Sequence, residues 1–137
     1  MICELCAAVG GQLLWKDSLC RVALIDEPGY AGYCRVIWNS HVAEMTDLSD
    51  ADRAHCMRVV LAVESVLREL LAPDKINLAS LGNFTPHVHW HVIPRFHDDP
   101  HFPQAIWAAR QREAPSRAVA ADLHDQIARS IATRLHE

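Results

Sequence analysis

The sequence predicts an α+β protein: a five-stranded antiparallel sheet with one long helix and a second helix at the C-terminal end. Five short runs are rich in β-branched and aromatic residues, and two longer stretches carry apolar residues at helical spacing. With 137 residues, of which half are apolar, the chain can bury a substantial core. We therefore expect a single domain over 1–137, with its core in about 1–110.

The five expected strands are separated by residues that favour turns. Asp17 and Ser18 stand between the first two strands, and Pro28 and Gly29 belong to the loop before the third. A short loop that contains Gly82 joins the last two strands, so we expect an antiparallel hairpin there, at the centre of the sheet. The strands are expected at 12–16, 20–26, 33–38, 75–80 and 87–93.

Two stretches have the apolar spacing of amphipathic helices. Ser49 begins a capping-box pattern that opens the long helix, and Pro73 ends it. Its buried stripe is expected to contain Met57, Val60, Val63, Leu67 and Leu70. The second helix is expected over about 116–135, with a stripe of Val119, Leu123, Ile127, Ile131 and Leu135. Residues 97–115 show no periodic pattern and are expected to be irregular.

The composition argues against several function classes. A formal charge of −4 without a basic run gives no electrostatic basis for binding nucleic acid. No segment approaches the ~20 apolar residues of a membrane span, and the N-terminus lacks the pattern of a signal peptide. We therefore expect a cytoplasmic location, reduced thiols and no organic cofactor. Among the five cysteines, Cys20, Cys34 and Cys56 fit core positions, while Cys3 and Cys6 form a Cys-x-x-Cys pair.

The most informative stretch is the expected fifth strand, in which histidines alternate with apolar residues. Side chains alternate between the two faces of a strand, so His87, His89 and His91 share one face. With 9 histidines in 137 residues, this spacing has a roughly 4% chance of arising from composition alone. Near neutral pH an imidazole can act as nucleophile, base or metal ligand. The stretch therefore indicates a site for phosphoryl chemistry or for a metal.

The stretch from His87 to Ile93 resembles the signature of the histidine triad family, and the Pro94-Arg95 that follows is also common there. The family's order of features is also present: an N-terminal Cys-x-x-Cys, Asp26 at the end of an early strand, a strand that leads into His41, a long helix and an Asn-containing strand. The resemblance covers roughly residues 1–110. Within the family, the chain is most similar to bacterial hydrolases of diadenosine polyphosphates.

The resemblance implies that His89 attacks the α-phosphate of a nucleotide, forming a nucleotidyl-histidine that water then hydrolyses. Dinucleoside polyphosphates or nucleoside phosphoramidates are the implied substrates. His91 would contact the phosphate oxygens or the leaving group, and Asn77 would orient the site. Nucleotide binding is assigned to Asp26, which would accept from ribose hydroxyls, and to Asn83 and Thr85. Many family members carry Gly-Gln-Ser or Gly-Gln-Thr before the triad, where this chain has Asn83-Phe84-Thr85-Pro86.

The resemblance also implies a metal and a partner. Some family members bind a structural zinc ion, and the matching ligands here would be Cys3, Cys6, His41 and His87. Such an ion would tie the N-terminus to the active strand and would not activate water. Histidine triad proteins typically form two-fold dimers, so a homodimer is expected.

Two other function classes stay open. The alternating histidines could bind a catalytic metal, as in a zinc-dependent hydrolase, although the Cys-x-x-Cys offers zinc a closed site elsewhere. The chain could also be a non-catalytic nucleotide-binding protein that has kept the pocket. For single residues, Asn77 could be a buried structural amide, and Asn83 and Asp26 could be turn residues. The three histidines could also face solvent on an edge strand.

Overall fold

The computed structural model describes residues 2–136 and confirms the predicted α+β fold. Its five strands form one sheet in the order β1-β2-β3-β5-β4, and each neighbouring pair is antiparallel. The strands are β1 Gln12–Lys16, β2 Cys20–Leu24, β3 Cys34–Trp38, β4 Lys75–Ala79 and β5 His89–Arg95. The helices are α1 Glu4–Ala7, α2 Asp50–Leu71 and α3 Leu123–Leu135, with a 3-10 turn, η1, at Met45–Asp47.

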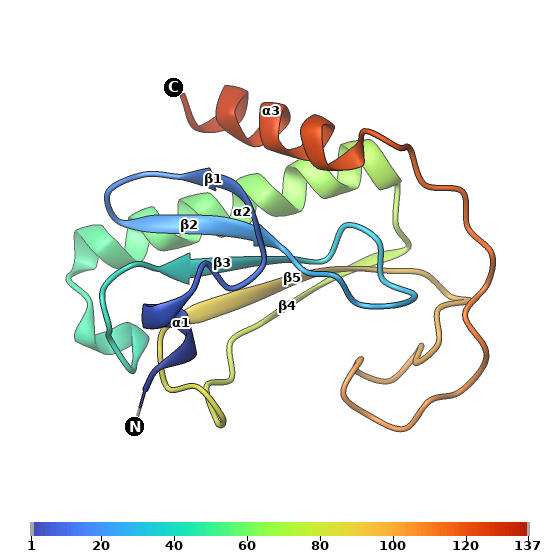
Figure 1. Ribbon diagram of the computed structural model, residues 1–137, viewed down its shortest axis with the longest axis horizontal. Helices are drawn as coiled ribbons and strands as arrows, with labels where there is room; N and C mark the ends of the chain where they lie inside the picture. The colour runs from blue at the N-terminus through green and yellow to red at the C-terminus, as the bar shows by residue number, and fades with distance from the viewer. Residues whose placement is uncertain (1, 137) are drawn as a thin grey trace.

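The sheet is covered differently on its two faces. Helices α2 and α3 pack together against one face, which buries the main apolar core (Figure 1). This core includes Val22, Val36, Val63, Val92 and Ile127. The short α1 and several loops cover parts of the opposite face, where Leu5 packs against Ala23 and Ile37. No helix of the described residues is long and apolar enough to span a bilayer.

The long helix has the boundaries that its sequence predicts. Ser49 caps it, with the side-chain oxygen accepting a hydrogen bond from the Asp52 amide at 3.1 Å. Its last turn ends at Ala72, whose left-handed conformation (φ 46°) stops the helix one residue before Pro73. The stripe residues Val60, Val63 and Leu67 are fully buried, and Met57 and Leu70 pack partly buried against the same core.

The C-terminal helix begins at Leu123, seven residues later than its expected start. Val119, expected in its stripe, lies in the extended chain before the helix and is 47% exposed. A short helix depends on burying an apolar face, and Leu123 is the first residue of this segment to enter the core. Apolar spacing alone therefore overestimated the helix length.

Strand β5 also differs from its expected range and position. It begins at His89, two residues later than expected. The residue before it, Val88, accepts a backbone hydrogen bond from Trp38 and donates one to Val42, and the residue pairs with β4 begin only at His91. At the other end β5 continues past the last residue pair with β3, and Pro94 therefore needs no amide hydrogen there. The hairpin of β4 and β5 lies at the edge of the sheet, with β4 outermost, and not at the centre as expected.

An ion pair that is almost fully buried fixes the irregular segment after β5. The Arg95 guanidinium donates to both carboxylate oxygens of Asp99, at 2.7 and 3.0 Å. Asp99 also accepts from the amides of Phe96, His101 and Phe102. Burial would raise the pKa of Asp99, but the Arg95 hydrogen bond and these amides lower it to about 2. The pair therefore orders the chain that leads on towards Trp107.

Candidate active site and candidate zinc site

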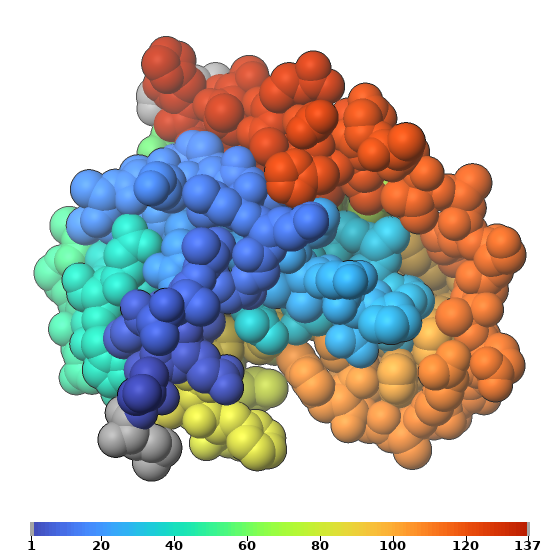
Figure 2. Space-filling view, viewed as in Figure 1, coloured from blue at the N-terminus to red at the C-terminus, as the bar shows by residue number. Residues whose placement is uncertain are grey.

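The three histidines lie together on the sheet face opposite α2. His87, His89 and His91 are 1%, 8% and 5% exposed, while Val88 and Val92 enter the core below. This burial argues against three solvent-facing histidines on an edge strand. Figure 2 shows a notch in the molecular surface between the loop that precedes β5 (yellow) and the segment that follows it (orange). The histidine strand runs between these two segments.

His89 is held in one tautomer by a backbone contact. Its Nδ1–H donates to the carbonyl oxygen of His87 at 2.6 Å, so the neutral ring presents an unprotonated Nε2. Burial lowers the pKa of His89, the bond to the carbonyl raises it, and the nearby charge of Arg35 lowers it further. A ring with a free Nε2 lone pair is suited to attack on phosphorus.

His91 is the neighbour of His89 on the same face, with ring centroids 5.0 Å apart. Its Nδ1 lies 2.6 Å from the hydroxyl of Tyr33, with which it forms a hydrogen bond. The ring of Trp107, from the irregular segment, meets it edge-on at 5.0 Å. Burial lowers the pKa of His91 to about 4, with smaller effects of His89 and Arg35, so the ring is neutral at pH 7.

His87 belongs to a second cluster, with Cys3, Cys6 and His41. Their candidate ligand atoms all lie within 4.8 Å of one another. The sulfur–nitrogen distances are 3.4 Å from Cys3 to His87, 3.3 Å from Cys6 to His41 and 3.5 Å from Cys6 to His87. Tetrahedral zinc with ordinary bond lengths separates sulfur and nitrogen ligands by about 3.6 Å, so the four residues fit the ion.

The orientation of the His87 ring also fits a metal ligand. Its Nε2–H donates to the carbonyl oxygen of Trp38 at 2.5 Å, which leaves Nδ1 as the nitrogen that faces both sulfurs. Zinc-bound histidines commonly donate their other ring nitrogen to a carbonyl in this way. The only other such cluster within residues 2–136 is Asp17, Cys20 and His55, so neither cluster includes His89 or His91.

The loop before β5 carries two of the predicted nucleotide-binding residues, and β4 carries Asn77, which was predicted to orient the site. Asn83 and Phe84 are exposed on this loop, and Thr85 is partly buried. A cavity of about 250 Å³ beside His89 is lined by Leu81 and Gly82 of the same loop. Asn77 faces the same side of the sheet as the triad, but its side-chain oxygen accepts from Arg95 at 2.7 Å. Its role in orienting the triad stays a prediction.

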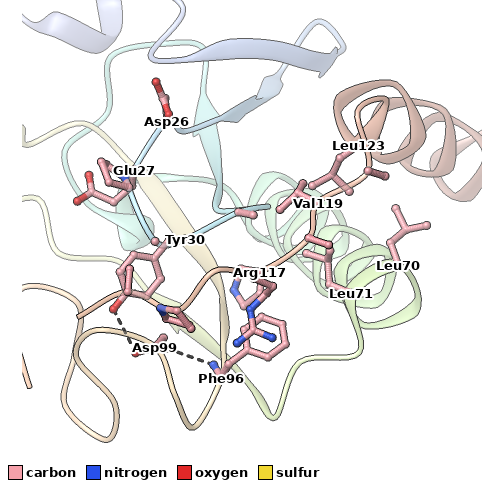
Figure 3. Close-up of a pocket in the computed structure, with 18 of the residues that line it drawn as sticks. Asp26, Glu27, Tyr30, Leu70, Leu71, Phe96, Asp99, Arg117, Val119 and Leu123 are labelled. Carbon is pink, nitrogen blue, oxygen red and sulfur yellow. Dashed lines mark hydrogen bonds between the residues drawn. The ribbon is translucent and has the colours of Figure 1, made fainter. Parts of the chain in front are cut away.

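Asp26 is exposed on the loop after β2 and borders a different, larger cavity (Figure 3). This cavity of about 610 Å³ lies between that loop, the end of α2 and the chain that leads into α3, and no triad histidine lines it. In Figure 3, Arg117 and Phe96 lie on the opposite side of the cavity from Asp26. Ribose binding by Asp26 stays a prediction.

Two residues beside the triad were not singled out from the sequence. Tyr33, just before β3, bonds to His91, and Arg35 on β3 pairs in register with the same histidine. A signal for Arg35 was present, because an arginine in the expected strand Tyr33–Trp38 interrupts an otherwise apolar run. A central strand accepts such a charge only where its face carries polar groups or a ligand.

A family model described as HIT domain matches residues 9–98, which is more than half of the chain. The protein therefore belongs to the HIT family, whose histidine triad is the one described above. A curated relative, the asymmetrical bis(5'-nucleosyl)-tetraphosphatase of Schizosaccharomyces pombe, is 26% identical over 92 residues. That match covers 64% of this chain and 50% of the relative, so the chain spans about half the length of the curated protein it matches.

Solved structures of the family share the fold. A histidine triad protein from Marinobacter aquaeolei VT8 is similar with a TM-score of 0.74 and 23% identity, covering 99% of this chain and 96% of its own. A histidine triad protein from Sinorhizobium meliloti 1021 gives 0.74 and 23%, with coverages of 98% and 96%. A zinc-bound family protein from Mycobacterium smegmatis gives 0.66 and 20%, with coverages of 96% and 94%.

Proposed function

We propose that the protein hydrolyses nucleotides at the α-phosphate through a covalent nucleotidyl-histidine on His89. The observation that carries this proposal is the hydrogen bond from His89 Nδ1 to the His87 carbonyl, which leaves Nε2 free as a nucleophile. Membership of the HIT family and the similarity to a bis(5'-nucleosyl)-tetraphosphatase support the same chemistry. The proposed substrates are dinucleoside polyphosphates or nucleoside phosphoramidates.

The reaction proceeds in two displacements at phosphorus. In the first, the Nε2 lone pair of His89 forms a P–N bond, and the bond to the leaving group breaks with its electron pair. The modified ring carries a positive charge, which the His87 carbonyl stabilises through the Nδ1–H. In the second, a water oxygen bonds to phosphorus, the P–N pair returns to Nε2, and one proton of the water passes to the solvent.

The other predicted residues have supporting roles in this proposal. His91 donates to the leaving group, Asn83 and Thr85 bind phosphate oxygens, and Asp26 accepts from the ribose. Asn83 is exposed and Asp26 borders another cavity. The substrate must therefore extend from the triad to the loop before β5 and to the loop after β2 to make both contacts. Asn77 acts on the site through Arg95, to which it is bonded.

Trapping of the covalent intermediate tests the proposed function. The protein is mixed with diadenosine tetraphosphate, quenched within a turnover, and its peptides are analysed by mass spectrometry under conditions that preserve P–N bonds. We expect the mass of one adenosine monophosphate on the peptide that contains His89. Hydrolysis without any adduct would contradict the covalent route, and binding without hydrolysis would favour the non-catalytic alternative.

We also propose that Cys3, Cys6, His41 and His87 bind one structural zinc ion. The ion would supply a link between the N-terminal turn and β5, because its four ligands come from three separate parts of the chain. His89 is not among the ligands, so removal of the ion should leave its nucleophilic nitrogen free.

Zinc removal should therefore lower stability more than it lowers the rate per folded molecule. We expect the Cys6→Ser variant to lose its zinc, measured by elemental analysis, and to melt several degrees below the wild type. Cys56→Ser is the control, because Cys56 lies outside the cluster, and the zinc content of this variant should equal that of the wild type. A complete loss of turnover by folded, zinc-free protein would instead favour a metal-dependent reaction.

The expected homodimer and cytoplasmic location remain predictions. Sedimentation equilibrium of the purified chain tests the first, since a monomeric mass at micromolar concentration would contradict it. Cell fractionation tests the second.

A further inference from the structure

Arg35 lies at the centre of the sheet, on the same face as the histidine triad. In the antiparallel register it stands directly opposite His91 on β5 and opposite Ala23 on β2. Residues directly opposite each other point to the same face, with Cβ atoms about 5 Å apart. Ala23 therefore lies on one side of Arg35 and His91 on the other. The guanidinium therefore extends over the face that carries His89 and His91.

Its charge has no carboxylate partner. Within residues 2–136 no Asp or Glu oxygen lies within ion-pairing distance of Arg35, and its Nε is buried without a hydrogen-bond acceptor. Arg35 is partly buried, but a buried N–H without an acceptor destabilises the folded protein, so its Nε is an unmet hydrogen-bond donor. The contrast with Arg95, which is fully paired with Asp99, is clear. An anionic ligand on this face would supply the missing acceptor.

Tyr33 connects Arg35 to His91. Burial raises the pKa of Tyr33, and the positive charge of Arg35 acts in the opposite direction. The Tyr33 oxygen lies 2.6 Å from His91 Nδ1. The hydroxyl can donate to this nitrogen, because one ring nitrogen of a neutral imidazole is an acceptor. A neutral His91 that accepts at Nδ1 carries its proton on Nε2. In this arrangement the outer nitrogen of His91 is a hydrogen-bond donor.

We propose that Arg35 binds a nonbridging oxygen of the phosphate that His89 attacks, and that Tyr33 positions His91 as a donor to the leaving group. The proposal rests on the proposed function and adds to it the residues that recognise the anion. A phosphate beside His89 also lies beside His91, because the two rings are 5.0 Å apart, and hence within reach of the residue opposite. A guanidinium pairs strongly with phosphate oxygens in a site that excludes water.

Equilibrium binding of AMP and adenosine tests the role of Arg35, because only AMP carries the phosphate. We expect Arg35→Gln to weaken AMP binding by about tenfold to a hundredfold in calorimetry and to change adenosine binding less than about twofold. Arg35→Lys, which keeps the charge without the planar fork, should fall between the two. Arg35→Met keeps the apolar stem and replaces Arg35→Gln if that variant does not unfold cooperatively.

The matched control is Arg129→Gln, which removes the same charge from an exposed position on α3. It should bind both ligands like the wild type. An unchanged AMP affinity in Arg35→Gln, an equal loss for adenosine, or no AMP binding by the wild type would overturn the proposal. This binding measurement requires no turnover. Failure to find an adduct on His89 would overturn the covalent mechanism and leave the Arg35 result standing on its own.

Tyr33→Phe removes only the hydroxyl and tests the positioning role. Two AMP derivatives are compared: adenosine 5'-phosphoramidate, whose leaving group must take up a proton, and the p-nitrophenyl ester of AMP, whose leaving group needs none. We expect the variant to lose about tenfold or more in kcat on the phosphoramidate and much less on the ester. A merely structural role would slow both substrates equally, and that result would overturn the assignment of Tyr33.

Discussion

Replacement of His89 with alanine should lower substrate hydrolysis by about a thousandfold or more, because the variant lacks the atom that forms the P–N bond. Binding of AMP should remain measurable, since Arg35 and His91 stay in place. Initial rates with diadenosine tetraphosphate, together with calorimetry of AMP binding, measure the two effects. The combination of lost turnover and retained binding is specific to a nucleophile.

The control for this variant is His97→Ala. His97 lies after β5, its side chain is mostly exposed, and it is not part of the triad face. Its variant should hydrolyse substrate at the wild-type rate. Should His89→Ala retain the wild-type rate, His89 would not be the nucleophile, and the reaction would have to begin elsewhere.

The largest expected effect on stability comes from Asp99. Asp99→Ala leaves the buried Arg95 guanidinium without its carboxylate, and loss of one partner of a buried ion pair typically costs about 3–5 kcal/mol. Three backbone amides also lose their acceptor. Urea unfolding of the variant measures the change. Asp98→Ala, next in the chain and largely exposed, should change the free energy of unfolding by less than about 1 kcal/mol.

The same pair predicts an acid dependence of stability. The pKa of Asp99 is about 2 in the folded protein and about 3.9 in an unfolded chain, so the folded state favours the carboxylate. Its stabilisation is fully present above about pH 4 and is lost as the pH falls through 4 towards 2. The shift corresponds to about 2–3 kcal/mol. If Asp99→Ala and the wild type lost stability equally over this interval, the pair would not be responsible.

The strand pattern and the capped helix could be predicted because they depend on local signals. The alternation from His87 to Val92 placed imidazoles and valines on opposite faces, and Ser49 and Pro73 bounded the long helix. The order of the strands could not be predicted so well, because the neighbours of each strand are set by the packing of the whole sheet. Hence β4 was expected at the centre and lies at the edge.

Site residues were predictable where the spacing itself carried the information. The cluster of Cys3, Cys6, His41 and His87 was expected from the family pattern, and the structure brings all four together. The relation of Tyr33 and Arg35 to His91 was not foreseen, because it depends on the register between β3 and β5, which a single sequence does not specify. The contact of Asn77 with Arg95 was missed for the same reason.

The sulfur of Cys3 lies against His87, 84 positions further along the chain. During synthesis, Leu5 can dock on Ala23 and Ile37 early, whereas Cys3 can reach His87 only after 84 further residues have been made. Contacts between residues so distant in sequence also form slowly, because a large loop must close first. The contact between Cys3 and His87 is thus among the last in this sheet to form, although Cys3 is made long before β5.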